Sequence, residues 1–183
     1  MKKLYIIAGP NGAGKTTASY TILPEIFNCN EFVNADEIAK GISPFNPDKV
    51  AIQAGKLMLK RINDLLEKNV TFALETTLSA KNFVKYIKKA REQKYEVVLL
   101  FLSLDSKKLA IERVKIRVKE GGHNIPNETI ERRFENGLKN FFQIYQKIVD
   151  KWILANNSGK TFQFIAESSE NEIYVKDEKK CKS

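Results

Sequence analysis

An eight-residue segment near the start of the chain has the residue types and spacing of a phosphate-binding loop. Residues 9–16 read Gly-Pro-Asn-Gly-Ala-Gly-Lys-Thr and match Gly-x-x-x-x-Gly-Lys-Ser/Thr in full. Glycines let backbone N–H groups turn toward phosphate oxygens, and a helix beginning near Gly14 directs its positive dipole end there. We expect Lys15 to reach the β- and γ-phosphates and Thr16 to ligate Mg²⁺.

The apolar run Leu4–Ala8 directly precedes this loop, which favours nucleotide binding over the alternative of a glycine-rich surface turn. The predicted nucleotide, ATP or GTP, would be held by the loop and the residue after it: Gly9, Pro10, Asn11, Gly12, Ala13, Gly14, Lys15, Thr16 and Thr17.

Two carboxylates stand where predicted strands end. Ligands of open α/β sheets bind outside the carboxyl ends of the strands, and phosphoryl transfer needs a base near the acceptor hydroxyl. Asp36, after Phe32-Val33-Asn34-Ala35, is the predicted base; capping of a helix over residues 37–40 is the alternative. Glu75, with Thr76 beside it, is expected to face Mg²⁺, its waters or the acceptor, the alternative being bonds to neighbouring amides. For Asp105 a helix cap is favoured over a magnesium ligand.

A pair of arginines could clamp the phosphoryl group during transfer. Arg113 and Arg117 are four residues apart and therefore share one helix face, and Gly121-Gly122 could serve as the hinge of a closing lid. Solvated surface arginines are the alternative, because the region is generally basic. The lid is predicted around residues 113–133.

Further candidates lie on the far side of this predicted lid. Arg132 and Arg133 could add to the clamp, and no spacing in the sequence decides whether either of them does. For His123, the single histidine, a solvated turn is favoured over catalysis, and one histidine alone makes no metal site.

Alternating strand-like and helical stretches must position these residues. The alternation predicts an α/β three-layer sandwich with a mostly parallel sheet and helices on both faces. The predicted strands are 3–8, 31–35, 70–74, 96–104, 152–156, 162–166 and 173–175, the last ones forming an edge hairpin or antiparallel addition. The first predicted helix runs from Gly14 until Pro24 stops it. The second begins at an Asn46 cap and has an inner apolar stripe of Val50, Ala54, Leu57, Met58, Ile62 and Leu65. Further helices are predicted over Phe83–Ala90, over 106–120 and from about Asn127.

Length and charge narrow the class of protein. The 183 residues suit one domain, predicted over 1–175 with a charged tail over 176–183. No apolar run is long enough for a signal peptide or a membrane span, and the two cysteines imply no disulfide framework, so we expect a cytoplasmic protein without membrane attachment. The net charge is +9, and residues 81–120 hold 12 Lys/Arg against 5 Asp/Glu. Such a field suits phosphorylated small molecules; nucleic acid is the less favoured partner because few aromatic residues interleave the lysines.

Four segments in this order resemble the zeta-toxin family of small P-loop kinases: the phosphate loop, Phe-Val-Asn-Ala-Asp, Leu-Glu-Thr-Thr-Leu, and Arg-Val-Lys-Ile-Arg-Val with Gly-Gly-His-Asn-Ile-Pro. The resemblance covers about residues 4–158 and implies ATP- and Mg²⁺-dependent phosphorylation of UDP-N-acetylglucosamine at a sugar hydroxyl, which in toxin members poisons cell-wall synthesis and can involve an antitoxin partner. It implies Lys15 and Thr16 on the ATP side, Asp36 as base, Glu75 in the substrate site and Arg117 in the lid.

The chain departs from that pattern in the lid. Toxin members carry a further arginine shortly before the lid proline, whereas residues 120–126 contain none. Either Arg113, Arg132 or Arg133 substitutes for it, or transfer is altered. The predicted catalytic residues are thus Lys15, Asp36, Arg113 and Arg117, and the predicted acceptor-binding residues are Ser43, Glu75, Thr76, Arg132 and Arg133. A nucleotide-gated protein acting through a protein partner and a nucleic-acid end kinase are the alternative functions.

Overall fold

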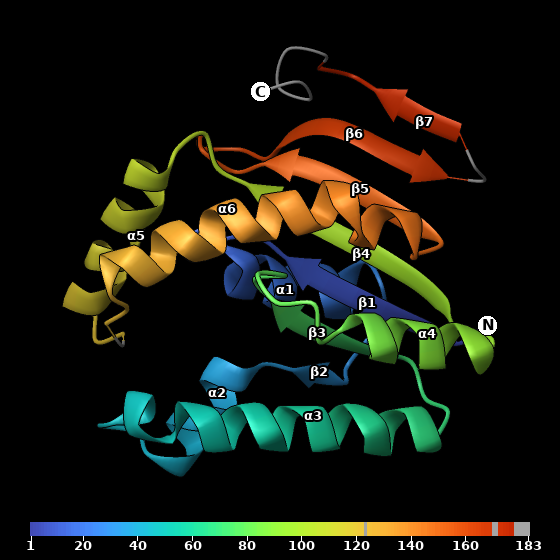
Figure 1. Cartoon of the computed structure of the whole chain (residues 1–183), viewed down its shortest axis with the longest axis horizontal. Coiled ribbons are helices and arrows are strands. Elements are labelled where there is room, and N and C mark those ends of the chain that lie inside the picture. Colours follow the sequence, from blue (N-terminus) through green and yellow to red (C-terminus); the bar gives the residue numbers. More distant parts are fainter. Residues whose placement is uncertain (123, 170–171, 178–183) are drawn as a thin grey trace.

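One mixed sheet organises the chain (Figure 1). The structure is a computed structural model that describes residues 1–122, 124–169 and 172–177. Within these ranges seven strands lie in the order β2-β3-β1-β4-β5-β6-β7; the first five are parallel, and β6 and β7 are added antiparallel at one edge. The strands are β1 (Lys3–Ala8), β2 (Phe32–Val33), β3 (Phe72–Thr76), β4 (Glu96–Ser103), β5 (Lys151–Asn156), β6 (Gln163–Ser169) and β7 (Glu172–Val175). The predicted parallel α/β sheet with an antiparallel edge is confirmed.

Helices cover both faces of this sheet. They are α1 (Lys15–Glu25), α2 (Ala35–Ile42), α3 (Ala51–Glu67), α4 (Val84–Glu92), α5 (Lys107–Lys119) and α6 (Asn127–Gln143), with the short 3₁₀ helices η1 (Pro47–Val50) and η2 (Tyr145–Lys147). The helices α3 and α4 lie over one face of the sheet and form the first hydrophobic core with it, and α1 and α5 lie over the other face and form the second core. The helix α6 contributes Phe141 to the first core and Ile130 to the second. The three-layer sandwich is therefore confirmed.

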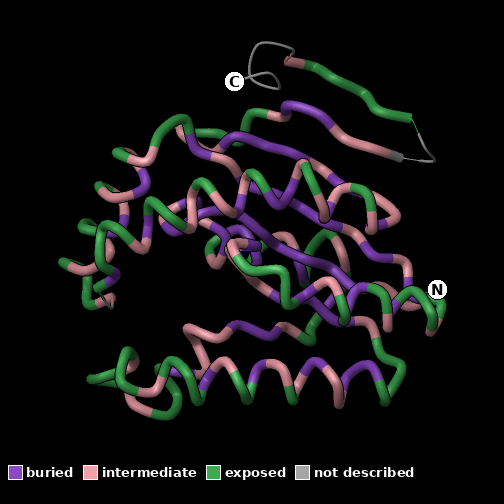
Figure 2. Tube along the Cα trace, viewed as in Figure 1, coloured by how far each residue is buried: buried purple, intermediate pink, exposed green. Residues whose placement is uncertain are grey.

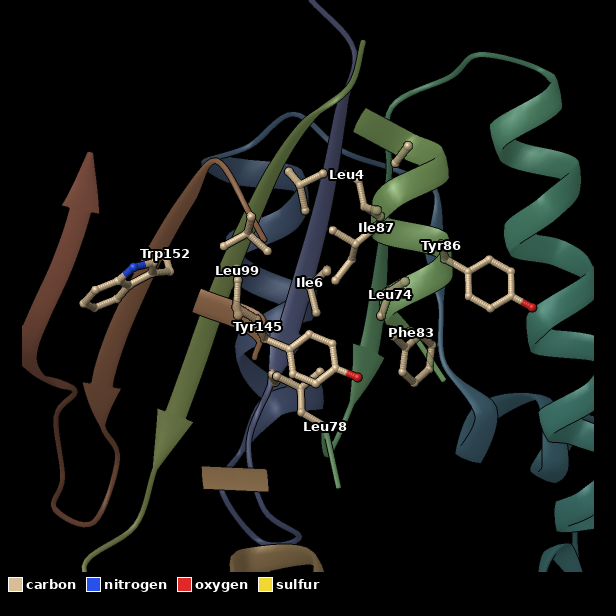
Figure 3. Close-up of a cluster of buried hydrophobic side chains, with 14 of the residues drawn as sticks. Leu4, Ile6, Leu74, Leu78, Phe83, Tyr86, Ile87, Leu99, Tyr145 and Trp152 are labelled. Atoms are coloured by element: carbon tan, nitrogen blue, oxygen red, sulfur yellow. The ribbon is translucent and has the colours of Figure 1, made fainter. Parts of the chain in front are cut away.

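The central strand β1 shows why the sheet needs two covering layers. Successive side chains of a strand point to opposite faces, and here Leu4 and Ile6 enter one core while Tyr5 and Ile7 enter the other. A strand buried on both faces reads as a continuous apolar run, and Figure 2 shows the central strands as largely buried. Figure 3 shows Leu4 and Ile6 among residues of β3, β4 and α4 in the first core.

Two strand boundaries differ from the prediction, and both shifts bear on the site. The strand β3 pairs in parallel with β1 from Leu4↔Phe72 to Ala8↔Thr76, so it begins two residues later than expected and contains Glu75 instead of ending before it. The strand β2 stops at Val33, because α2 has already begun at Ala35. Pairing with β1, which the local sequence does not encode, sets the limits of β3, and β2 in turn pairs only with β3.

Two helix predictions also need correction. Pro24 does not stop α1, which ends at Glu25, because a proline in the last turn removes only one late backbone donor. Asn46 makes no capping hydrogen bond, and the 3₁₀ turn η1 separates it from α3. Along α3, Leu57 is 41% exposed, whereas Leu66 is buried, so the inner stripe is rotated relative to the predicted one.

Candidate functional site

The phosphate loop connects β1 to α1 and is packed too closely for most side chains. Gly9 has φ +141°, and a Cβ there would lie 2.2 Å from the carbonyl oxygen of Leu102 in β4. Gly14 precedes the first residue of α1 with φ +78°, and a Cβ there would lie 2.7 Å from Nδ2 of Asn157. That amide in turn donates to the carbonyl oxygen of Ala13 at 2.9 Å. The loop geometry therefore depends on glycine and on the segment that follows β5.

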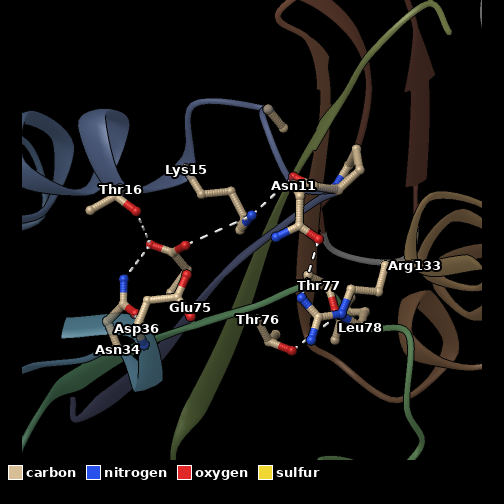
Figure 4. Close-up of polar contacts among 12 residues, drawn as sticks. Asn11, Lys15, Thr16, Asn34, Asp36, Glu75, Thr76, Thr77, Leu78 and Arg133 are labelled. Atoms are coloured by element: carbon tan, nitrogen blue, oxygen red, sulfur yellow. Dashed lines mark hydrogen bonds and ion pairs between the residues drawn. The ribbon is translucent and has the colours of Figure 1, made fainter. Parts of the chain in front are cut away.

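Glu75 is the hub of the polar contacts beside this loop (Figure 4). Its Oε2 accepts hydrogen bonds from Oγ1 of Thr16 and from Nδ2 of Asn34, both at 2.9 Å. Its Oε1 lies 3.7 Å from Nζ of Lys15, which also donates to the carbonyl oxygen of Pro10 at 3.0 Å. The register places Glu75 opposite Ile7, two residues before the loop begins. The carboxylate thus faces both side chains that the loop motif assigns to phosphate and Mg²⁺.

Burial perturbs both charges of this pair. Loss of solvent raises the pKa of Glu75, an effect that nearby Lys15 and the Thr16 hydroxyl partly offset. Loss of solvent also lowers the pKa of Lys15, and Glu75 and Asp36 partly offset that shift. In a buried ion pair, the attraction between the two charges largely offsets the free energy that their desolvation costs. The pair therefore contributes little net stability.

Asp36 lies in the first turn of α2, not at the end of a strand. The N-cap of α2 is Asn34, whose Oδ1 accepts from the backbone N of Asp36 at 2.8 Å and of Glu37 at 3.4 Å. The capping alternative for Asp36 is therefore wrong, because the cap is already supplied by an amide side chain. Asn34 was missed by sequence reasoning, although an Asn three residues before Glu37 is a capping pattern.

Asp36 lines three cavities that share other lining residues. The phosphate cavity, about 240 Å³, is lined by the loop together with Asp36, Glu75, Arg113, Arg117 and Glu120. The second cavity, about 180 Å³, is lined by Asn11, Lys15, Asn34, Ala35, Asp36, Met58, Glu75, Thr76, Thr77, Phe83 and Arg133. The third cavity, about 270 Å³, is lined by Thr16, Asp36, Glu37, Lys40, Arg117, Glu120, Gly121 and Gly122. Asp36 is therefore placed between the phosphate loop and further space that could hold an acceptor.

The two arginines of α5 have different surroundings. The guanidinium of Arg113 donates to three backbone carbonyl oxygens, at 2.6 Å to Asn157, 3.0 Å to Ser158 and 3.4 Å to Gly12. In Arg117, by contrast, Nε and Nη2 are buried and have no hydrogen-bond partner among the described residues. Both line the phosphate cavity. Arg113 thus ties the phosphate loop to the loop after β5, whereas Arg117 has donors to offer an anion.

The glycines after α5 terminate that helix. The N–H of Gly121 bonds to the carbonyl of Val118 at 3.1 Å, and that of Gly122 to the carbonyl of Arg117 at 2.8 Å. With φ +91° at Gly121, this is a Schellman motif. Lid movement about this point stays a prediction.

Of the remaining predicted site residues, two line a cavity and two do not. Arg133 lines the second cavity and donates to Oδ1 of Asn11 at 3.3 Å, and Thr76 lines the same cavity. Burial lowers the pKa of Arg133, while Asp36 opposes that shift. Arg132 is exposed, and Ser43 is the C-cap residue of α2; neither lines any of the three cavities.

Asp105 lies next to the cap of α5 but does not supply it. The cap of α5 is Ser106, whose hydroxyl accepts from the backbone N of Leu109, so the capping prediction for Asp105 is wrong. The Asp105 carboxylate instead accepts from Nδ2 of Asn156 at 2.8 Å. His123 lies outside the described residues, as does most of the predicted tail.

Mg²⁺ fits the donor set beside the loop. No group of three or more His, Cys, Asp or Glu that could hold a metal ion by itself occurs in the described ranges. Mg²⁺ needs no such cage, because it keeps several waters and binds one or two protein oxygens together with substrate phosphates. The Thr16 hydroxyl and the Glu75 carboxylate, 2.9 Å apart, are hard oxygen donors of this kind.

Comparison with known proteins decides the family. The sequence profile described as Zeta toxin matches residues 1–169. The chain belongs to the zeta-toxin family. An uncharacterized protein of Haemophilus influenzae is 29% identical over 143 residues, 73% of this zeta-toxin family member and 98% of that protein. The family, one of P-loop kinases, was thus predicted correctly from the order of the motifs.

Two solved structures show the same fold in proteins of low sequence identity. A chain of the AvrRxo1-ORF1:-ORF2 crystal structure with ATP superimposes with a TM-score of 0.84 at 15% identity, covering 100% of this chain and 63% of that one. A chain from the PezAT chromosomal toxin–antitoxin system of Streptococcus pneumoniae gives 0.65 at 18% identity, covering 88% and 72%. This zeta-toxin family member thus spans less than two thirds of the AvrRxo1 chain. No helix in the described part of the chain has the length and apolar character needed to cross a membrane.

Proposed function

We propose that this protein is a cytoplasmic ATP-dependent kinase that transfers the γ-phosphoryl group to a hydroxyl of a nucleotide-activated sugar such as UDP-N-acetylglucosamine. The observation that carries the proposal is the position of Asp36, which lines the phosphate cavity and both adjoining cavities. A carboxylate between a phosphate loop and a neighbouring cavity suits a base that accepts the proton of an acceptor hydroxyl. Membership of the zeta-toxin family supports the same reaction.

The donor half of the site binds and orients ATP. The backbone N–H groups at the start of α1 would surround the phosphates, and Lys15 would leave its contact with Glu75 to meet the β- and γ-oxygens. Arg117, with two buried donors, would bind the equatorial oxygens of the transferring group. Thr16 and Glu75 would hold Mg²⁺, directly and through its waters; when bound, the ion neutralises charge on the β- and γ-phosphates.

The acceptor half would lie in the second cavity. Arg133 supplies a cation there, and Met58 and Phe83 supply apolar surface. The acceptor oxygen would form a bond to the γ-phosphorus as the bond from that phosphorus to the β,γ-bridging oxygen breaks, leaving ADP. Asp36 would accept the hydroxyl proton. Arg133 is our candidate for the lid arginine that residues 120–126 lack, because Arg132 lines none of the three cavities described above and Arg113 is engaged with backbone carbonyls.

Labelled phosphate tests this proposal. The purified protein, given Mg²⁺ and ATP labelled at the γ-position, should transfer label to UDP-N-acetylglucosamine. Asp36→Asn should bind ATP with unchanged affinity and lose about 10²–10⁴-fold in kcat, the usual contribution of a general base. Tight ATP binding with no transfer to this sugar or to any compound of a broad metabolite extract would contradict kinase function. Full activity of Asp36→Asn would contradict the assignment of the base.

A second function is favoured by the assemblies to which the two similar solved chains belong. One contains AvrRxo1-ORF1 with AvrRxo1-ORF2, and the other belongs to a toxin–antitoxin system. We therefore also propose that this chain binds an antitoxin-like protein. Pull-down from the native host with and without ATP should recover one partner in a nucleotide-dependent manner, and a purified complex should show suppressed transfer. Equal recovery with Lys15→Ala and wild type in all nucleotide states would exclude nucleotide-gated binding.

A further inference from the structure

Asn34 connects the two carboxylates of the candidate site. It lies between β2 and α2 and is only 6% exposed. Its Nδ2 donates to Oε2 of Glu75 at 2.9 Å, while its Oδ1 accepts from the backbone N of Asp36 at 2.8 Å and of Glu37 at 3.4 Å. One side chain therefore holds the carboxylate beside Thr16 and also begins the helix that carries Asp36 (Figure 4).

Helix capping alone would not require asparagine at this position. Serine, aspartate and asparagine cap helices about equally well. Only a side-chain amide offers an acceptor on one arm and a donor on the other. An aspartate would direct a second carboxylate oxygen at Oε2 of Glu75, and a serine is too short to serve both partners. Asparagine therefore suits both contacts, whereas the cap alone would accept several other residue types.

The contact to Glu75 has a consequence for the metal side of the site. Oε2 of Glu75 is shared between the Asn34 amide and the Thr16 hydroxyl, both at 2.9 Å. Without the amide, the carboxylate keeps, among the described residues, the Thr16 hydroxyl and the 3.7 Å contact to Lys15, and it can turn about its own side-chain bonds. Partners of this kind orient the groups that hold a metal, and their loss typically lowers metal affinity or activity about 10–100-fold.

We propose that Asn34 is a positioning residue of the phosphoryl transfer, which orients Glu75 toward Thr16 and Mg²⁺ and fixes the turn that carries Asp36. The inference rests on the proposed kinase function. It assigns to Asn34 no contact with the transferring atoms, so its replacement should affect kcat and the Mg²⁺ requirement more than the binding of ATP itself.

Two variants that keep the cap separate positioning from capping. Both Asn34→Ser and Asn34→Asp should lose about 10–100-fold in kcat with little change in the KM for ATP; Asn34→Ser should melt near the wild-type temperature, whereas Asn34→Asp should melt lower because it buries a second carboxylate beside Glu75. Asn34→Asp should be the slower of the two because it opposes two carboxylates. Half-maximal binding of a fluorescent ATP analogue should need about tenfold more Mg²⁺ in both variants. Ser106→Asn, a matched exchange of one capping residue for another at α5, should change neither quantity.

A double-mutant cycle completes the test. In a Glu75→Gln background, Asn34→Ser should have no further effect on kcat or on the Mg²⁺ requirement, because its partner carboxylate is already gone. Wild-type kcat and Mg²⁺ requirement in Asn34→Ser would overturn the inference, as would full additivity with Glu75→Gln. If the wild type binds Mg²⁺-ATP but transfers to no acceptor, the kinase proposal fails, and the Mg²⁺ titration of Asn34→Ser still decides the role of Asn34. Should Asn34→Asp unfold, Asn34→Ser carries the decision.

Discussion

Replacing Lys15 with methionine should cost far more stability at pH 8 than at pH 5. Lys15 Nζ lies 3.7 Å from Glu75 Oε1, and both side chains are less than 10% exposed. At an effective dielectric constant of ~20, two unit charges at this separation attract by about 4.5 kcal/mol. Desolvation costs several kcal/mol for each ion, so the pair is near balance in the wild type. Methionine removes the attraction and leaves the Glu75 charge buried.

The pH dependence follows from the directions of the two pKa shifts. Burial holds the pKa of Glu75 above its ordinary 4.5, and loss of Lys15 would raise it further. A raised carboxyl pKa means that stability falls as pH rises from 4.5 through the folded-state pKa. The lowered pKa of Lys15 means that the wild type gains stability as pH rises from the folded-state pKa toward 10.5, a gain that the variant lacks. Both effects increase the cost of the substitution with pH.

Urea unfolding at pH 5, 6.5 and 8 measures this cost. We expect about 1 kcal/mol at pH 5, where the raised pKa of Glu75 most favours its neutral form and the hydrogen bond to Pro10 is the main loss, and about 3 kcal/mol at pH 8. The control is Lys15→Met with Glu75→Gln, which should lie within about 1 kcal/mol of the wild type at every pH because no unpaired charge remains. A cost that is constant with pH, or larger at pH 5, would refute this electrostatic reasoning.

The two arginines of α5 should respond in opposite ways to truncation. Arg117→Ala should lower kcat by about 10²–10³-fold, because it removes donors to the transferring group. It should leave the melting temperature unchanged, because Nε and Nη2 have no partner among the described residues. A lowered melting temperature with normal kcat would contradict this role. Arg113→Ala should destabilise the fold by about 2–3 kcal/mol in urea unfolding and raise the KM for ATP, because three hydrogen bonds to loop carbonyls are lost. Unchanged stability together with a large fall in kcat would place Arg113 among the phosphate ligands instead.

The sequence carried enough information to predict the phosphate loop and the sheet. The loop motif depends on glycines at fixed spacing, and β1 reads as buried on both faces, so both follow from local residue types. The strand limits around Glu75 did not follow, because the pairing of β3 with β1 joins segments almost 70 residues apart. The contact of Glu75 with Thr16 depends on that register and could be expected only as one of several possibilities.

The roles of neighbouring polar residues were harder to separate. Asp36 and Asn34 are both plausible caps, and only the backbone conformation shows that Asn34 supplies the cap and leaves Asp36 at the cavities. Arg113 and Arg117 share a helix face, yet the path of the loop after β5 decides that Arg113 meets carbonyl oxygens. Such differences arise from tertiary contacts that helical spacing does not record.

A structure of the protein with a non-hydrolysable ATP analogue, Mg²⁺ and UDP-N-acetylglucosamine would test the central claim most directly. We expect the acceptor hydroxyl to lie about 2.6–3.2 Å from a carboxylate oxygen of Asp36 and in line with the γ-phosphate. Glu75 should stay on the Mg²⁺ side with Thr16. An acceptor hydroxyl bonded to Glu75, with Asp36 away from the sugar, would contradict the assignment of Asp36 as the base.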